Sequence, residues 1–164
     1  MANISFQTKI NSRKPWGTAG DFLDGNNNHM YPLTLIVKEG ETVEVGKFAW
    51  DNGDGTCSPS GEGKPAGVIH RTYFIPISDF AKGATMTIPE RLACGISDKC
   101  SILMEISDVP TVGNKIFVNN TTGIITNAKA GTEVDGATET SFKIITLCDN
   151  EAAAGITVGV TNWE

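Results

Sequence analysis

The sequence predicts an all-β fold, a sandwich or small barrel of short antiparallel strands. Short apolar or alternating runs recur along the chain, and clusters of Gly, Asn, Asp and Pro separate them. Helix-forming stretches are few and extend for about one turn each, which is too short for a stable helix. No alternation of strands with long helices appears, so a parallel α/β fold is disfavoured.

The individual elements follow from these patterns in chain order. Residues 42–45 alternate apolar and polar side chains, and residues 156–161 place three branched apolar side chains on one face. Residues 115–119 and 123–126 flank an Asn-Thr-Thr turn, the outline of a hairpin. The predicted strands are residues 33–38, 42–45, 48–50, 66–76, 84–88, 102–106, 115–119, 123–126, 142–147 and 156–161. The one-turn helix candidates are residues 78–82, 90–94 and 151–154.

The first thirty residues differ in composition from the rest. They are rich in Asn, Gly and Ser and show no steady apolar period, which is typical of an extended arm lying over a surface. The same composition also fits a frayed terminus. We therefore expect an N-terminal arm over residues 1–30 and a β domain over residues 31–164. A further division near residue 83 would separate the β domain into two lobes.

Composition excludes several functional classes. The formal net charge is −6 and no basic stripe is present, so nucleic acid is not an expected partner. No apolar run approaches the roughly 20 residues that span a bilayer, so we expect no membrane contact. The N-terminus has no basic region leading into an apolar stretch, which predicts synthesis in the cytoplasm and four reduced cysteines.

Candidate catalytic and metal sites are weak, and we predict neither an enzyme nor a cofactor. The two histidines, His29 and His70, have no cysteine close in sequence, although a cysteine-dependent hydrolase or transferase remains a third class of function. Cys94 and Cys100 are separated by five residues, wider than the usual spacing of zinc ligands. Buried thiols acting as small apolar groups are the better interpretation of the cysteines.

An acidic turn and three tryptophans are the remaining candidates. Residues 51–55 resemble a calcium loop only superficially, because Gly53 replaces the second ligand, and a tight turn is the preferred interpretation. Trp50 beside this turn supports the alternative of a carbohydrate- or receptor-binding β module. Trp16 and Trp163 lie towards the two ends of the chain, where large aromatic side chains can anchor a partner or cover their own core.

Several short sequence segments, taken in order, resemble bacteriophage structural cement or capsid decoration (head auxiliary) proteins. The resemblance extends from about residue 18 to residue 160. It rests on residues 18–22 (TAGDF), 40–46 (GETVEVG), 64–71 (KPAGVIHR), 113–126 (GNKIFVNNTTGIIT), 138–147 and 154–160 (AGITVGV). Residues 90–100 and the four cysteines are not part of the pattern.

The resemblance implies a structural protein without enzymatic activity, located on the outer capsid surface of a virion assembled in the host cytoplasm. The implied partner is the major capsid protein, with the chain as a homo-oligomer, preferably a trimer, that ties neighbouring subunits together. A mobile arm that orders on docking can wrap a large surface. We therefore predict that the arm supplies the capsid contacts, through Phe6, Lys9, Arg13, Lys14, Trp16 and Phe22.

Overall fold

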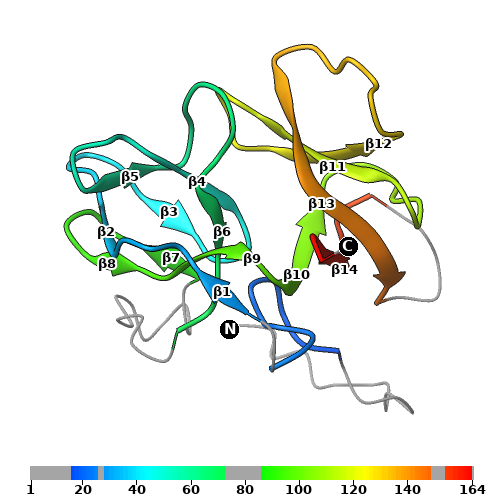
Figure 1. Cartoon of the computed structure of the whole chain (residues 1–164), viewed down its shortest axis with the longest axis horizontal. Coiled ribbons are helices and arrows are strands. Elements are labelled where there is room, and N and C mark those ends of the chain that lie inside the picture. The colour runs from blue at the N-terminus through cyan, green and yellow to red at the C-terminus, as the bar shows by residue number, and fades with distance from the viewer. Residues whose placement is uncertain (1–15, 26–27, 73–85, 149–153, 164) are drawn as a thin grey trace, which may run out of the picture.

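The computed structural model describes residues 16–25, 28–72, 86–148 and 154–163, and these residues form an all-β protein. The predicted fold class is confirmed: the sheets are built almost entirely from antiparallel pairs. The described residues contain no helix, and therefore none long and apolar enough to cross a membrane. Figure 1 shows the strands in two groups side by side, with β1–β9 in one and β10–β14 in the other.

The first group is a 7-stranded sheet of very short strands, in the order β1-β9-β6-β4-β5-β2-β8, accompanied by a two-stranded ribbon, β3-β7. Only β2 with β5 is a parallel pair in this part of the described chain. The strands are β1 (His29–Met30), β2 (Leu35–Val37), β3 (Val43–Glu44), β4 (Phe48–Asp51), β5 (Thr56–Ser58), β6 (Gly67–Ile69), β7 (Thr87–Ile88), β8 (Ala93–Cys94) and β9 (Ile96–Lys99).

The second group is a 5-stranded sheet of longer strands, in the order β10-β14-β13-β11-β12. Its members are β10 (Ser101–Ile106), β11 (Lys115–Asn119), β12 (Ile125–Ala128), β13 (Ala137–Leu147) and β14 (Ile156–Thr161). The amide of Ser107 donates to the carbonyl of Ile125 at 3.0 Å, which joins the end of β10 to β12. The sheet therefore curls until its two outer strands meet, as in a small barrel.

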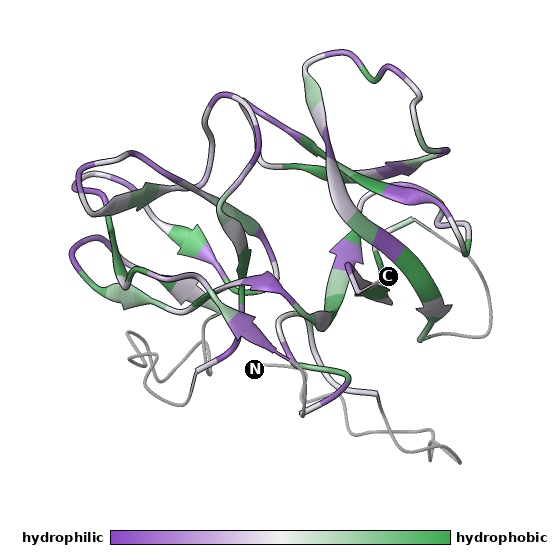
Figure 2. Ribbon diagram, viewed as in Figure 1, coloured by the Kyte–Doolittle hydropathy of each residue, from purple (hydrophilic) through white to green (hydrophobic). Residues whose placement is uncertain are grey.

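Two apolar clusters fill the interior. One lies within the first group and includes Val37, Val43 and Ile88, so the β3-β7 ribbon covers it. The other fills the second sheet and extends to Phe48 of β4, whose ring meets that of Phe142 edge to face at 5.7 Å. Apolar colour accordingly gathers on the strands, while the connecting loops are mostly polar (Figure 2). The two groups thus share a packed contact.

Several predicted elements match the strands and others differ. The strands predicted at residues 115–119 and 156–161 have the observed bounds. The helix candidate at residues 90–94 is wrong, because the chain turns at Arg91, whose φ is 62°, and then enters β8. The helix candidate at residues 78–82, all but the last residue of that at 151–154, and the possible division at residue 83 fall on residues outside the described part. So do the end of the strand predicted at 66–76 and the start of that predicted at 84–88.

Candidate interaction surface

Residues 18–23 are fixed against the second sheet by backbone hydrogen bonds. The Gly20 amide donates to the Leu103 carbonyl at 2.8 Å, and the Leu103 amide donates to Asp21 at 2.9 Å. The Leu23 amide then donates to Ser101 at 2.9 Å. Phe22 consequently lies opposite Ile102 in an antiparallel bridge, and the segment extends the sheet beyond β10.

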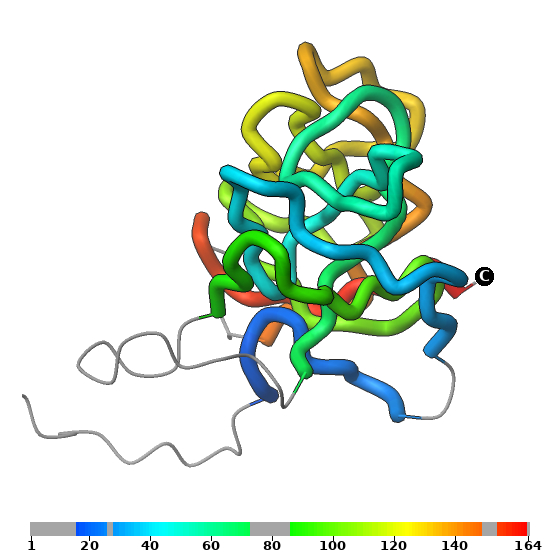
Figure 3. The backbone as a smooth tube through the Cα atoms, turned by 90° about the vertical axis from the view of Figure 1, so that its left-hand side faces the viewer, coloured from blue at the N-terminus to red at the C-terminus, as the bar shows by residue number. Residues whose placement is uncertain are grey.

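The same segment is also bonded to the first sheet. The Arg71 amide donates to the Gly20 carbonyl at 2.8 Å, and its guanidinium lies 3.3 Å from the Thr18 hydroxyl and 3.5 Å from a carboxylate oxygen of Asp21. Gly46 permits this approach, because a Cβ built there would lie 2.7 Å from that of Ala19. The backbone from residue 18 onward is therefore held by both groups of strands, low in the view of Figure 3.

An open cleft of about 730 Å³ lies where this segment meets the body. Trp16 and Phe22 line it together with His70, Arg71 and Thr72. The Trp16 side chain is 57% exposed, whereas Phe22 is half-buried, packs against the second core and stacks on the His70 ring at 5.2 Å. The cleft thus combines an apolar floor with an exposed indole at its rim.

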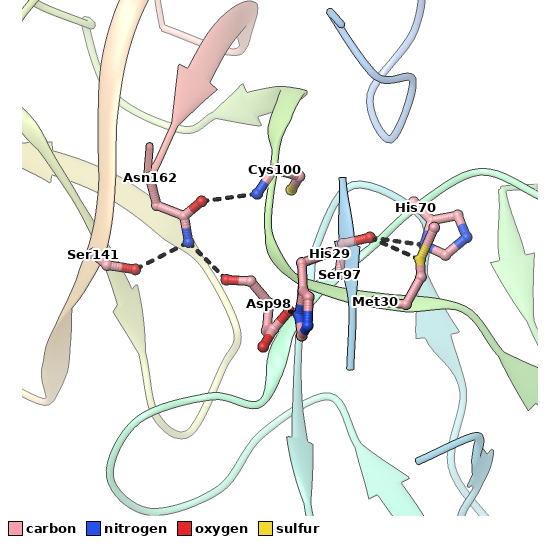
Figure 4. Close-up of polar contacts among 8 residues, drawn as sticks. All are labelled: His29, Met30, His70, Ser97, Asp98, Cys100, Ser141 and Asn162. Carbon is pink, nitrogen blue, oxygen red and sulfur yellow. Dashed lines mark hydrogen bonds and ion pairs between the residues drawn. The ribbon is translucent and has the colours of Figure 1, made fainter. Parts of the chain in front are cut away.

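A second cleft of about 440 Å³ adjoins the first, since His70 and Thr72 line both. Its apolar side chains include Met30 and Leu33, and both are exposed. The buried Ser97 hydroxyl contacts two of the lining residues, His70 through Nδ1 at 3.2 Å and Met30 through its sulfur at 3.4 Å (Figure 4). These contacts fix His70 and Met30 to β9 from beneath the surface.

The two histidines contact a hydroxyl group and a carboxylate. Partial burial lowers the pKa of His70, which favours the neutral ring stacked on Phe22. His29 lies on the surface, where its Nδ1 is 2.6 Å from a carboxylate oxygen of Asp98 (Figure 4). The hydrogen-bond partners of the two rings are thus Ser97 and Asp98, and neither ring contacts a thiol through a hydrogen bond.

Three of the four cysteines lie in the interior. Cys57, Cys94 and Cys100 are buried, and Cys148 is half-buried. Burial raises the pKa of the Cys100 thiol to about 12, so it stays protonated at neutral pH. Cys100 therefore lacks the lowered pKa and the access to solvent of a catalytic cysteine.

The carboxylates of the acidic turn accept hydrogen bonds from other groups of the protein. Asp51 accepts hydrogen bonds from the Gly53 amide and the Tyr31 hydroxyl, each at 2.8 Å. Asp54 accepts from the amide and the hydroxyl of Thr56, and these bonds lower the pKa of its carboxyl group. Within the described ranges no group of three His, Cys, Asp or Glu side chains is placed to hold a metal. The arrangement fits the predicted tight turn.

The tryptophans differ sharply in accessibility. Trp50 is only 3% exposed, and its indole donates to the Gly63 carbonyl at 3.2 Å, so the support expected from Trp50 for a carbohydrate-binding site is wrong. Trp163 is half-buried beneath the ammonium group of Lys99, 4.6 Å from the ring centroid. Trp16 is therefore the most exposed of the three tryptophans. Of the other predicted contacts, Phe22 lies in the cleft, and Phe6, Lys9, Arg13 and Lys14 lie outside the described residues.

The fold and the surface together define an all-β protein with two adjoining clefts. A family model described as "XM1 gp53 minor capsid protein" matches residues 6–162. The chain therefore belongs to the XM1 gp53 minor capsid protein family. Membership makes it a structural component of a viral capsid and implies a role without catalysis. No curated protein matches the sequence.

A solved structure supports the fold. A chain of the structure titled "The capsid of Myoviridae Phage XM1" superposes with a TM-score of 0.59 at 14% sequence identity. The match covers 97% of this chain and 98% of the other. At that identity the likeness shows a common fold over the whole length. The resemblance to capsid proteins seen in the sequence is thus confirmed at the level of a minor capsid protein.

Proposed function

We propose that the chain binds the outer surface of a phage capsid and stabilises contacts between major capsid subunits. The observation that carries the proposal is Trp16, an exposed indole at the rim of a cleft, two residues before a segment that both groups of strands hold in place. An exposed aromatic on a rigid base binds at low entropic cost, as at the energetic centres of protein interfaces. Family membership makes a capsid subunit the appropriate partner.

The residues that precede Trp16 suit the same role. The first 14 residues carry Lys9, Arg13 and Lys14 and no acidic residue, although the whole chain has a net charge of −6. Such a segment can dock on an acidic surface while the acidic body stays in solvent. We infer that Phe6 and the three basic residues add contacts to that of Trp16, and that Phe22 positions the segment from the body side.

Oligomerisation would strengthen this binding. In the proposed trimer, three copies of a weak contact engage neighbouring capsid subunits at once, and the effective concentration of the second and third contacts is high. Binding to the assembled shell in preference to free subunits then stabilises the shell by mass action. Light scattering of the purified chain and counting of copies on capsids would test the trimer.

Deletion of residues 2–16 tests the arm directly. We expect co-sedimentation with capsids that lack the protein to weaken by at least tenfold, with the urea midpoint of the chain unchanged. Trp16→Ala alone should weaken binding roughly tenfold or more, the loss typical of a central interface aromatic. Val109→Ala is the matched control, since Val109 is also 57% exposed. Full capsid occupancy by the deletion variant would contradict the proposal.

The alternative, a carbohydrate- or receptor-binding module of a fibre or tail, predicts a different result. It expects hits on a glycan array and no co-sedimentation with capsids. With Trp50 buried, the exposed aromatic left for sugar stacking among the tryptophans is Trp16. Binding of a glycan that Trp16→Ala abolishes would favour this alternative.

A further inference from the structure

Two buried cysteines lie against each other inside the first group of strands. The Sγ atoms of Cys57 and Cys94 are 3.0 Å apart, although the residues are 37 positions apart in the sequence. Cys57 belongs to β5 and Cys94 to β8, and these strands flank β2 on its two sides. Both side chains are almost fully buried, on the same inner face as Leu35 and Val37 of β2.

We propose that Cys57 and Cys94 form an oxidisable pair that closes into a disulfide when the chain meets a small oxidant such as a peroxide. A covalent S–S bond is about 2.05 Å long, so the sulfurs need to approach by about 1 Å from their separation of 3.0 Å. Neither the family description nor the capsid-binding role proposed above requires such a pair.

The surroundings of the two thiols give them different roles in the reaction. The two thiols share a hydrogen bond, and this bond lowers the pKa of Cys94 while it raises that of Cys57. Cys94 is therefore the better nucleophile, since the thiolate is the reactive form. Its sulfur also lies 3.6 Å from the Leu35 carbonyl, a contact that keeps it pointed inward beside its partner.

The reaction balances with one peroxide. The Cys94 thiolate attacks one peroxide oxygen, the O–O bond breaks, and hydroxide leaves as Cys94 becomes a sulfenic acid. The Cys57 sulfur then displaces the hydroxyl group from Cys94, which forms the S–S bond, and the Cys57 proton leaves with that group as water. The hydroxide takes up the proton that Cys94 lost on ionising, so the two sulfurs lose two electrons in total and hydrogen peroxide is reduced to two molecules of water.

The bond would tie β5 to β8 across β2 and close a loop over a span of 37 residues. In a reducing cytosol the pair remains two thiols, and outside the cell the bond persists once it has formed. A crosslink of this length restricts the unfolded chain, so we expect the oxidised protein to melt at least about 5 °C higher. The stabilisation would therefore apply to the released particle.

The test is thiol counting on the full-length chain before and after peroxide, with alkylation under denaturing conditions and intact mass. The reduced protein should take up four alkyl groups and the oxidised protein two, with a crosslinked peptide that joins Cys57 to Cys94. Cys148→Ser is the control and should also lose two reactive thiols. Cys57→Ser and Cys94→Ser should each keep all three remaining thiols.

Three outcomes would overturn the proposal. They are retention of all four thiols, a crosslink that involves Cys100 or Cys148, and oxidation of Cys94 to a sulfinic acid without a crosslink. Peptide mapping of the unsubstituted chain decides among these results even if a serine variant fails to fold. A reduced chain oxidised in urea should give mixed crosslinks, which would show that the folded geometry selects the pair.

Discussion

Asn162 holds together the point where the chain passes from the first group of strands to the second, and its removal should be costly. Its side-chain oxygen accepts from the Cys100 amide at 2.8 Å, and its amide group donates to the Asp98 carbonyl at 2.6 Å and to the Ser141 hydroxyl at 3.3 Å (Figure 4). The side chain is only 9% exposed. Asn162→Ala would therefore leave two backbone groups without partners beneath the surface.

The magnitude follows from those two groups. An unsatisfied buried donor or acceptor costs about 1–3 kcal/mol, so the two groups together should lower the free energy of unfolding of Asn162→Ala by about 2–6 kcal/mol. The free energy of unfolding of a small domain is about 5–15 kcal/mol in total. With a urea slope near 2 kcal/mol/M, the unfolding midpoint should fall by about 1–3 M.

Ser141→Ala is the matched control for this prediction. It removes only the longest of the three hydrogen bonds, and we expect a loss below about 1 kcal/mol. Urea unfolding followed by tryptophan fluorescence and by circular dichroism would measure both variants. If Asn162→Ala costs no more than Ser141→Ala, the backbone groups find other partners and the reasoning is refuted.

Two further predictions concern Gly46 and His70. Gly46→Ala should lower the free energy of unfolding in urea by about 1–3 kcal/mol more than Gly40→Ala does. Both residues have a φ of 81°, but only a Cβ at position 46 would meet Ala19. Equal losses of stability in the two variants would show that the segment at Ala19 moves aside. Because burial lowers the pKa of His70, the unfolded chain binds the proton first as the pH falls from about 7 to 5, and stability drops over that range. His70→Gln should reduce this pH dependence of the urea midpoint, and identical slopes for the two proteins would contradict the assignment.

The sequence predicted best those strands of five or six residues that carry a clear apolar pattern. β11 has three consecutive apolar residues between polar ends, and β14 has a branched apolar residue at every second position from Ile156, so the bounds of both strands were predicted correctly. Very short strands such as β8 were not predicted, because two residues are too few to show an alternation of apolar and polar side chains. The helix candidate there failed for a tertiary reason: the Glu90 carboxylate accepts from the Gly40 amide, and Arg91 adopts a left-handed conformation.

The interaction surface was only partly predictable. Trp16 stood out as a large aromatic in a polar stretch, and it is exposed as a contact residue should be. The attachment of residues 18–23 runs through backbone amides and carbonyls, which leave no trace in side-chain patterns. The pairing of Cys57 with Cys94 was likewise hidden, since strand order, which places β5 and β8 on either side of β2, decides which distant thiols meet.

The backbone pairing of residues 20–23 with β10 has a consequence for how truncations behave. A strand edge that loses its partner exposes free amides and carbonyls, which invite other chains and lead to aggregation. Truncation before residue 18 leaves the outer edge of β10 covered, whereas truncation beyond residue 23 exposes Ser101 and Leu103 on that edge. The two kinds of truncation therefore report on different properties, partner binding in the first case and solubility in the second.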